Sequence, residues 1–190
     1  MSSHTSDANA SHRSRFSTAD LAVTALSATL ITVCAWISIP TAVPFTLQTL
    51  AVFTTAGLLG MRRGTAAILV YILMAAVGIP VLAGMKGGAD KLIGTTGGYI
   101  VGFVFIALIV GFASDKWQRR PLPLAIAMLL GLAVCYAFGT AWFCLVYTRS
   151  AGSVALTTVL GWCVVPFLIP DGIKIAVAVL LTNRLGVYIR

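Results

Sequence analysis

The stretch LPLAIAMLLGLAVCYAFGTAWFCLV, Leu122–Val146, decides the fold class of this chain. Its 25 residues include no charged side chain. About 20 apolar residues in a helix are enough to cross the roughly 30 Å hydrocarbon core of a bilayer. Charge returns on both sides, at Arg120 and at Arg149. The stretch therefore predicts a transmembrane helix.

The composition of the whole chain agrees with that prediction. Of its 190 residues, 59% are hydrophobic and 9% are charged, and the mean hydropathy is +0.99. This balance excludes an ordinary water-soluble domain. The length leaves no room for a nucleotide-binding domain, and neither a Walker A run nor a G-x-G-x-x-G run is present. Any energy source is therefore expected in other chains.

Five further apolar runs lie between breaks in the sequence, so we expect an all-α integral membrane protein with six transmembrane helices. The second and third runs are each 15 residues long, which is short for a span. The last contains Pro166 and Pro170, and is interpreted as a short segment followed by a helix that begins near Pro170. The runs are Leu21–Ile39, Leu47–Met61, Thr65–Ile79, Gly97–Ala113, Leu122–Val146 and Val154–Leu185.

Basic residues divide unevenly between the two sides that six spans define. Lys and Arg gather in the cytoplasmic loops of membrane proteins, so both termini are expected to be cytoplasmic. The net charge of +8 is thereby explained by topology, and no nucleic-acid partner is expected. One side holds Arg13, Arg15, Arg62, Arg63, Lys116, Arg119, Arg120, Arg184 and Arg190, and the other holds Lys86, Lys91 and Arg149.

The polar stretch Met1–Thr18 has no apolar periodicity and predicts a disordered cytoplasmic tail, residues 1–18, before a single membrane domain, residues 19–190. The cysteines all lie inside apolar runs, without a C-x-x-C pair or a nearby histidine. Neither a metal nor a cofactor is therefore expected, and the cysteines are interpreted as small core or lipid-facing residues. They are Cys34, Cys135, Cys144 and Cys163.

Asp171 and Lys174 are the charges that remain inside an apolar run. A charge at the centre of a membrane helix costs roughly 2.5–3.5 kcal/mol on insertion scales, so such residues face a cavity or a partner and commonly mark function. Their i,i+3 spacing places both on one helix face, where they can pair. The prolines before them place Asp171 in the first helical turn, beside a cavity that would open outward. An ion pair that only fixes helix packing is the alternative.

Two more residues and one loop are candidates for a site. Gln48 follows a proline-bracketed, uncharged loop and offers a donor and an acceptor to an amide or urea; alternatively it bonds another helix. The glycine-rich stretch 84–98 is interpreted as a lid or as a plain flexible connector. Tyr99 opens the next helix, where an aromatic residue of the membrane interface is the simpler interpretation.

An ordered set of short motifs runs through most of the chain. It comprises VPFTLQTL (Val43–Leu50) followed by GLLG (Gly57–Gly60), GIPV (Gly78–Val81) with Ala83-Gly84, Gly87-Gly88, GGY (Gly97–Tyr99), and Pro166-Phe167 with Asp171 and Lys174. Together these motifs resemble the BioY family, the biotin-specific substrate-binding (S) component of energy-coupling-factor (ECF) vitamin transporters.

The resemblance implies a multi-pass protein of the cytoplasmic membrane that captures biotin outside and delivers it inward, without catalysis. The implied partners are biotin, the lipid bilayer, a transmembrane coupling protein and two cytoplasmic ATPases. Asp171 would accept from a ureido N–H, and Lys174 would meet the ureido carbonyl or the carboxylate. Gln48 would meet either ureido edge, while Phe45 and Tyr99 would bracket the apolar rings.

Other functions stay open on the residues alone. An S component for a different vitamin or small cofactor would keep the same architecture. A membrane enzyme, such as an acyl or lipid transferase, is disfavoured because the chain has no Glu, no His outside the tail and no carboxylate pair for acid–base catalysis. A purely structural subunit would use Asp171 and Lys174 only for each other.

Overall fold

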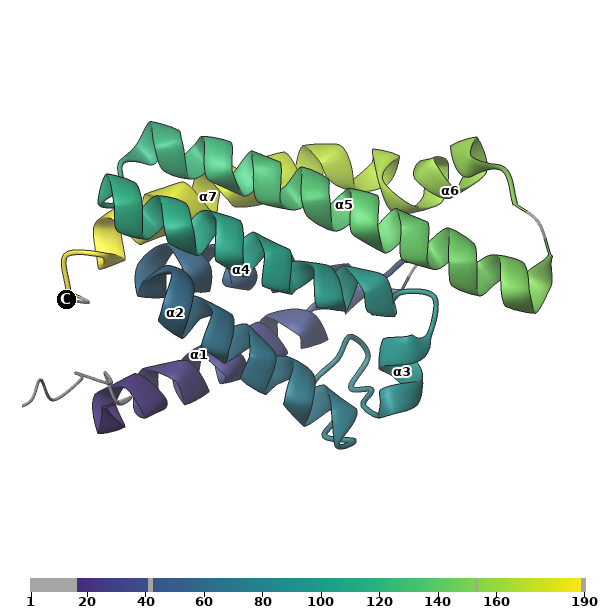
Figure 1. Cartoon of the computed structure of the whole chain (residues 1–190), viewed down its shortest axis with the longest axis horizontal. Helices are drawn as coiled ribbons and strands as arrows, with labels where there is room; N and C mark the ends of the chain where they lie inside the picture. The colour runs from purple at the N-terminus through teal and green to yellow at the C-terminus, as the bar shows by residue number, and fades with distance from the viewer. Residues whose placement is uncertain (1–16, 41–42, 153, 189–190) are drawn as a thin grey trace, which may run out of the picture.

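The computed structural model is a helical bundle with one small hairpin, and it describes residues 17–40, 43–152 and 154–188 (Figure 1). Most of the predicted tail, residues 1–16, lies outside this part of the chain, while Ser17 caps the first helix. The elements are α1 (Thr18–Trp36), β1 (Ser38–Ile39), β2 (Phe45–Thr46), α2 (Gln48–Ala76), α3 (Ala89–Ile93), α4 (Gly97–Trp117), α5 (Pro121–Ala151), α6 (Leu156–Cys163), a 3₁₀ turn η1 (Val165–Phe167) and α7 (Leu168–Leu185).

Within the described residues, five helical stretches are long and apolar enough to cross a membrane. They are α1, α2, α4, α5 and the run from α6 to α7. The predicted second and third spans both fall within α2, which consists of two helical parts joined at a kink. The predicted break between these spans, at Arg62–Gly64, is wrong because the backbone stays helical there. The non-helical residue inside α2 is instead Gly60, with φ 74° and ψ −175°.

Gly60 divides α2 because its backbone conformation is not helical. This conformation is nearly exclusive to glycine. The N–H of Met61 has lost its partner in the preceding turn and donates instead to Asp115 Oδ2 of α4, 2.9 Å away. A Cβ at Gly60 would overlap the Asp115 carboxylate. Asp115 thus caps the second part of α2, and α2 turns back at the left of Figure 1.

Polar contacts gather four elements at this end of the bundle. Arg63, just past the break, forms an ion pair with Asp20 in the first turn of α1, at 2.9 Å. Arg119, after α4, donates to the backbone oxygens of Leu58 in α2, at 2.8 Å, and of Gly186 after α7, at 2.5 Å. The start of the first helix and the end of the last one therefore lie at the same end of the bundle, on the left of Figure 1.

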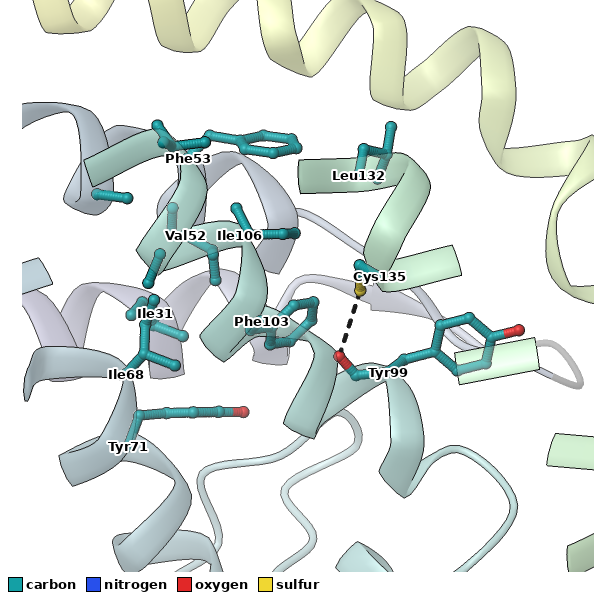
Figure 2. Packing of buried hydrophobic residues seen from close by; sticks show 14 of the residues in the cluster. Ile31, Val52, Phe53, Ile68, Tyr71, Tyr99, Phe103, Ile106, Leu132 and Cys135 are labelled. Atoms are coloured by element: carbon teal, nitrogen blue, oxygen red, sulfur yellow. Dashed lines mark hydrogen bonds between the residues drawn. The ribbon is translucent and has the colours of Figure 1, made fainter. Parts of the chain in front are cut away.

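Small residues on α4 allow α5 to pack closely against it, as their four-residue spacing predicts. A Cβ at Gly98 would overlap the side chain of Trp142, and one at Gly102 would lie 2.7 Å from Cys135 Sγ. Around this contact the core is closely packed, with Ile106 fully buried. Figure 2 shows Cys135 of α5 directed at the first turns of α4.

The hairpin is a departure from the all-α expectation. Ser38 pairs with Thr46 and Ile39 with Phe45 in an antiparallel ladder of two short strands. The cause is the pair Pro40 and Pro44, because proline removes a donor and holds its predecessor extended. The second strand of the hairpin leads directly into the start of α2, where the first residues of the candidate site lie.

Candidate ligand-binding site

A cavity of about 330 Å³ lies among the start of α2, the glycine-rich loop and α4, α5, α6 and α7. Small-molecule sites commonly enclose roughly 300–1,000 Å³, so the volume suits a compact ligand. Its wall is largely apolar, with a few polar groups converging from separate helices. Four of the five predicted site residues line it: Gln48, Tyr99, Asp171 and Lys174.

The predicted pair of Asp171 and Lys174 is present. Lys174 Nζ lies 2.7 Å from Asp171 Oδ1, and the two residues are 6% and 2% exposed, respectively. Thr49 of α2 completes a triangle, because it accepts from Lys174 at 3.0 Å and donates to Asp171 Oδ1 at 3.0 Å. Buried charges of opposite sign reduce each other's desolvation cost in this way, and the triangle ties α7 to α2.

Tyr136 of α5 binds the other oxygen of the same carboxylate. Its hydroxyl donates to Asp171 Oδ2 at 2.5 Å, and its side chain lines the cavity. Tyr136 is not among the site residues predicted from the sequence. A signal was available, because Tyr136 lies in the middle of Leu122–Val146, too deep for an aromatic residue of the membrane interface.

Phe45 lies behind the cavity wall rather than in it. Its ring stacks on Phe167, with centroids 5.8 Å apart, and Phe167 is the one of the two that lines the cavity. Lys174 Nζ lies 4.5 Å from the centroid of Phe45, within the range of a cation–π contact. Phe45 therefore supports the position of the lysine.

Gln48 lines the cavity at the first turn of α2 and is 6% exposed. Its backbone N–H donates to Thr46 Oγ1 at 3.2 Å, so the hairpin caps the helix. Its side-chain Nε2 donates to the hydroxyl of Tyr71 at 2.8 Å, and that hydroxyl donates to the backbone oxygen of Val81 at 3.1 Å. Gln48 therefore connects both parts of α2 with the loop that follows.

Tyr99 is buried in the cavity wall, 8% exposed, rather than placed in a lipid-facing belt. Its hydroxyl shares a hydrogen bond of 3.0 Å with Thr140 Oγ1 of α5, and its backbone oxygen accepts from Cys135 Sγ at 3.6 Å. Figure 2 shows its ring reaching from α4 toward α5, with Phe103 one turn further along. Both aromatic residues line the cavity and add apolar surface to its wall.

The glycine-rich loop adds charged residues to the cavity wall, namely Lys86, Asp90 and Lys91. Lys91 Nζ lies 2.7 Å from Asp90 Oδ2, and this hydrogen bond holds the pKa of Asp90 below its usual value. Trp142 Nε1 of α5 donates to the backbone oxygen of Gly94 at 3.0 Å, which anchors the end of the loop. With Asp171 and Lys174, the described lining carries one net positive charge.

The four cysteines do not form a shared metal site in the described part of the chain. Among the described residues, no group of three His, Cys, Asp or Glu side chains is placed to hold a metal ion. Cys135 and Cys163 are buried and contribute to the cavity wall, while Cys34 and Cys144 are half-buried. All four are free thiols.

Comparison with known proteins gives a consistent result. The model of the BioY family matches residues 7–189. A protein named biotin transporter BioY, from Thermotoga maritima, is 43% identical over 161 residues, which are 82% of this chain and 89% of that protein. A protein named probable biotin transporter BioY, from Pyrococcus horikoshii, is 36% identical over 167 residues, covering 87% and 95%.

A solved structure has the same fold. It is a crystal structure of the S-component for biotin from an ECF-type ABC transporter, with a TM-score of 0.78 and 27% sequence identity. The likeness covers 90% of this chain and 96% of that one.

Proposed function

The chain belongs to the BioY family, and from this premise we propose that it binds biotin in the cavity as the substrate-binding component of an ECF-type transporter. The observation that carries the proposal is the cluster of Asp171, Lys174, Thr49 and Tyr136 in a largely apolar cavity. Burying charged groups in a membrane helix bundle costs free energy, so such groups commonly mark a ligand site or a transport pathway.

The chemistry of biotin suits this lining. Its ureido ring has two N–H donors and a carbonyl, its thioether ring is apolar, and its tail ends in a carboxylate. Gln48 and the Asp171–Lys174 pair offer donors and acceptors to the ureido ring, and Tyr99 packs on the apolar rings. The net positive charge of the lining matches a single carboxylate, for which Lys86 and Lys91 are candidates besides Lys174.

We propose six membrane crossings in one domain, residues 19–190, with both termini in the cytoplasm. The division of α2 at Gly60 supports counting its two parts as separate crossings. The contacts of Arg63 with Asp20 and of Arg119 with Gly186 support placing the two ends of the described chain on one side. The excess of Lys and Arg on that side favours the cytoplasm.

The proposed partners are a transmembrane coupling protein and two cytoplasmic ATPases. The chain has no nucleotide-binding motif, and the similar solved structure comes from an ECF-type ABC transporter. Proteoliposomes containing this chain alone are expected to bind biotin without accumulating it. Accumulation on ATP addition without the other subunits would overturn this division of roles.

Calorimetric titration of the purified, detergent-solubilised chain with biotin tests the proposed ligand. The wild-type chain is expected to bind, and Asp171→Asn and Lys174→Ala are each expected to bind at least tenfold more weakly, since a hydrogen bond to a charged group contributes about 1.5–3 kcal/mol. The assignment would be wrong if the wild-type chain did not bind biotin, or if both variants bound it as tightly as the wild type does.

A different vitamin is the alternative ligand. Lipoate, thiamine and riboflavin are the competitors that separate the two readings. Each is expected to leave bound biotin in place at equal concentration. Displacement by one of them would transfer the assignment to that compound.

A further inference from the structure

The hydrogen-bonding character of the cavity at Gln48 is set by Tyr71, a residue outside the cavity. Tyr71 lies in the second part of α2, is fully buried and does not line the cavity. A phenol has one hydrogen to donate, and Tyr71 gives it to the backbone oxygen of Val81 at 3.1 Å. Its oxygen is then left to accept from Gln48 Nε2 at 2.8 Å.

Val81 makes the opposite arrangement unfavourable. If Tyr71 donated to Gln48 instead, the carbonyl of Val81 would lose its donor. Val81 is 2% exposed, and an unpaired buried carbonyl costs about 1–3 kcal/mol. The direction of both hydrogen bonds therefore follows from the single hydrogen of the phenol.

This direction determines which edge of the Gln48 amide faces a ligand. An amide whose surroundings are neutral can present either its NH₂ or its oxygen, because the two have nearly the same shape. Here Nε2 faces Tyr71, so Oε1 faces the other way. In the described part of the chain no donor reaches Oε1, and Gln48 lines the cavity. One N–H of Nε2 is used on Tyr71, and Oε1 is the acceptor that the fixed amide offers to a ligand.

The charged cluster offers the complementary group. Both oxygens of Asp171 already accept, Oδ1 from Lys174 and Thr49 and Oδ2 from Tyr136. Lys174 has three hydrogens and uses two of them, on Asp171 and Thr49. It retains one N–H, so the cavity has an acceptor at Gln48 and a donor at Lys174.

We infer that Tyr71 is a positioning residue that fixes the orientation of the Gln48 amide and leaves Oε1 free to accept, so that the site favours a ligand with an N–H group opposite Gln48. This assignment rests on the proposed function: the group is a ureido N–H of biotin, and the ureido carbonyl faces Lys174. Tyr71 acts through Gln48 and does not touch the ligand.

The test is a double-mutant cycle on biotin binding, measured as Kd by calorimetry. Tyr71→Phe is expected to raise Kd about three- to tenfold, the effect of one neutral hydrogen bond. In a Gln48→Ala background the same change is expected to have no further effect. Tyr147→Phe is the matched control, because Tyr147 stacks on Phe143 away from the cavity lining, and it is expected to keep the wild-type Kd.

A second ligand separates positioning from packing. In cyclic carbamate analogues of biotin, one ureido N–H is replaced by an oxygen, which repels an acceptor. The wild-type chain is expected to discriminate against the analogue altered at the Gln48 position, and Tyr71→Phe is expected to discriminate several-fold less, because the freed amide can turn its NH₂ to the ligand. A merely structural role would leave that ratio unchanged.

Three results would overturn the inference while biotin binding by the wild-type chain stands. They are an equal Kd for Tyr71→Phe and wild type, an equal loss in both Gln48 backgrounds, and an unchanged carbamate ratio. If Tyr71→Phe does not fold, Gln48→Ala alone is expected to abolish the preference for urea over carbamate, and its persistence overturns the inference. Failure of the wild-type chain to bind biotin would instead overturn the proposed function.

Discussion

At the residue scale, the buried charges of Asp171 and Lys174 balance each other before any ligand arrives. The carboxylate of Asp171 accepts from three side chains, and Lys174 bonds two of the residues in the same cluster. Removing one member of a buried ion pair is strongly destabilising, by about 3–5 kcal/mol, because the other charge is left without a partner. Replacing both members removes that penalty.

This balance predicts that variants of the pair affect the stability of the chain and its binding of biotin differently. Lys174→Met is expected to lower the thermal unfolding temperature of the detergent-solubilised chain, and Asp171→Asn combined with Lys174→Met is expected to recover part of the loss. Neither variant is expected to bind biotin as the wild type does. If the double variant is as unstable as Lys174→Met, or binds normally, the cluster does not have both roles.

The sequence indicated the buried pair of charges but not the neutral residues that hydrogen-bond to the predicted site residues. Asp171 and Lys174 stand out because charge is rare inside an apolar run. Thr49 and Tyr71 do not, since both residue types are ordinary in membrane helices. Their roles depend on partners distant in the chain, such as the 122 residues that separate Thr49 from Asp171, and spacing within one helix cannot reveal such pairs.

At the element scale, the course of α2 was the least predictable feature. Arg62 and Arg63 interrupt the apolar pattern and indicated a loop, yet both lie in regular helix with their side chains exposed. The break falls at Gly60, the last residue of the Gly-Leu-Leu-Gly motif, where the apolar pattern continues without interruption. By contrast, the start of α7 at Leu168 agrees well with the position indicated by Pro166 and Pro170, because proline constrains the backbone directly.

The break in α2 predicts that Gly60 tolerates no side chain. Gly60→Ala is expected to destabilise the chain by more than the 1–3 kcal/mol or so of its backbone conformation, because the added Cβ would also displace Asp115 from the N–H of Met61. Gly161→Ala is the control, since a Cβ there meets open space in α6. Thermal unfolding of both variants makes the comparison, and equal unfolding temperatures would contradict the role of Gly60.

At the scale of the whole molecule, the proposed orientation in the membrane can be tested at the two charged ends of α5. Arg120 precedes α5 and Arg149 lies in its last turn, and both are exposed. A helix of 31 residues extends about 46 Å at 1.5 Å per residue, so its two ends lie on opposite sides of a bilayer.

Labelling of the two ends of α5 tests this orientation. In a background without the native cysteines, Arg149→Cys is expected to react with a membrane-impermeant maleimide in intact cells. Arg120→Cys is expected to react only after the membrane is permeabilised. The reverse pattern would invert the proposed topology, and reaction of both in intact cells would exclude a membrane-spanning α5.

Helix α1 is attached near both of its ends. The ion pair of Asp20 with Arg63 joins it to the second part of α2, and the bond from Trp36 Nε1 to the backbone oxygen of Pro80, at 2.9 Å, joins it to the loop after α2. It contributes no residue to the described cavity lining. Its outer side, with Ala25 among the exposed residues, can therefore change in sequence without altering the ligand site. Adaptation to a neighbouring membrane protein and adaptation to a ligand are thus evolutionarily separable in this fold.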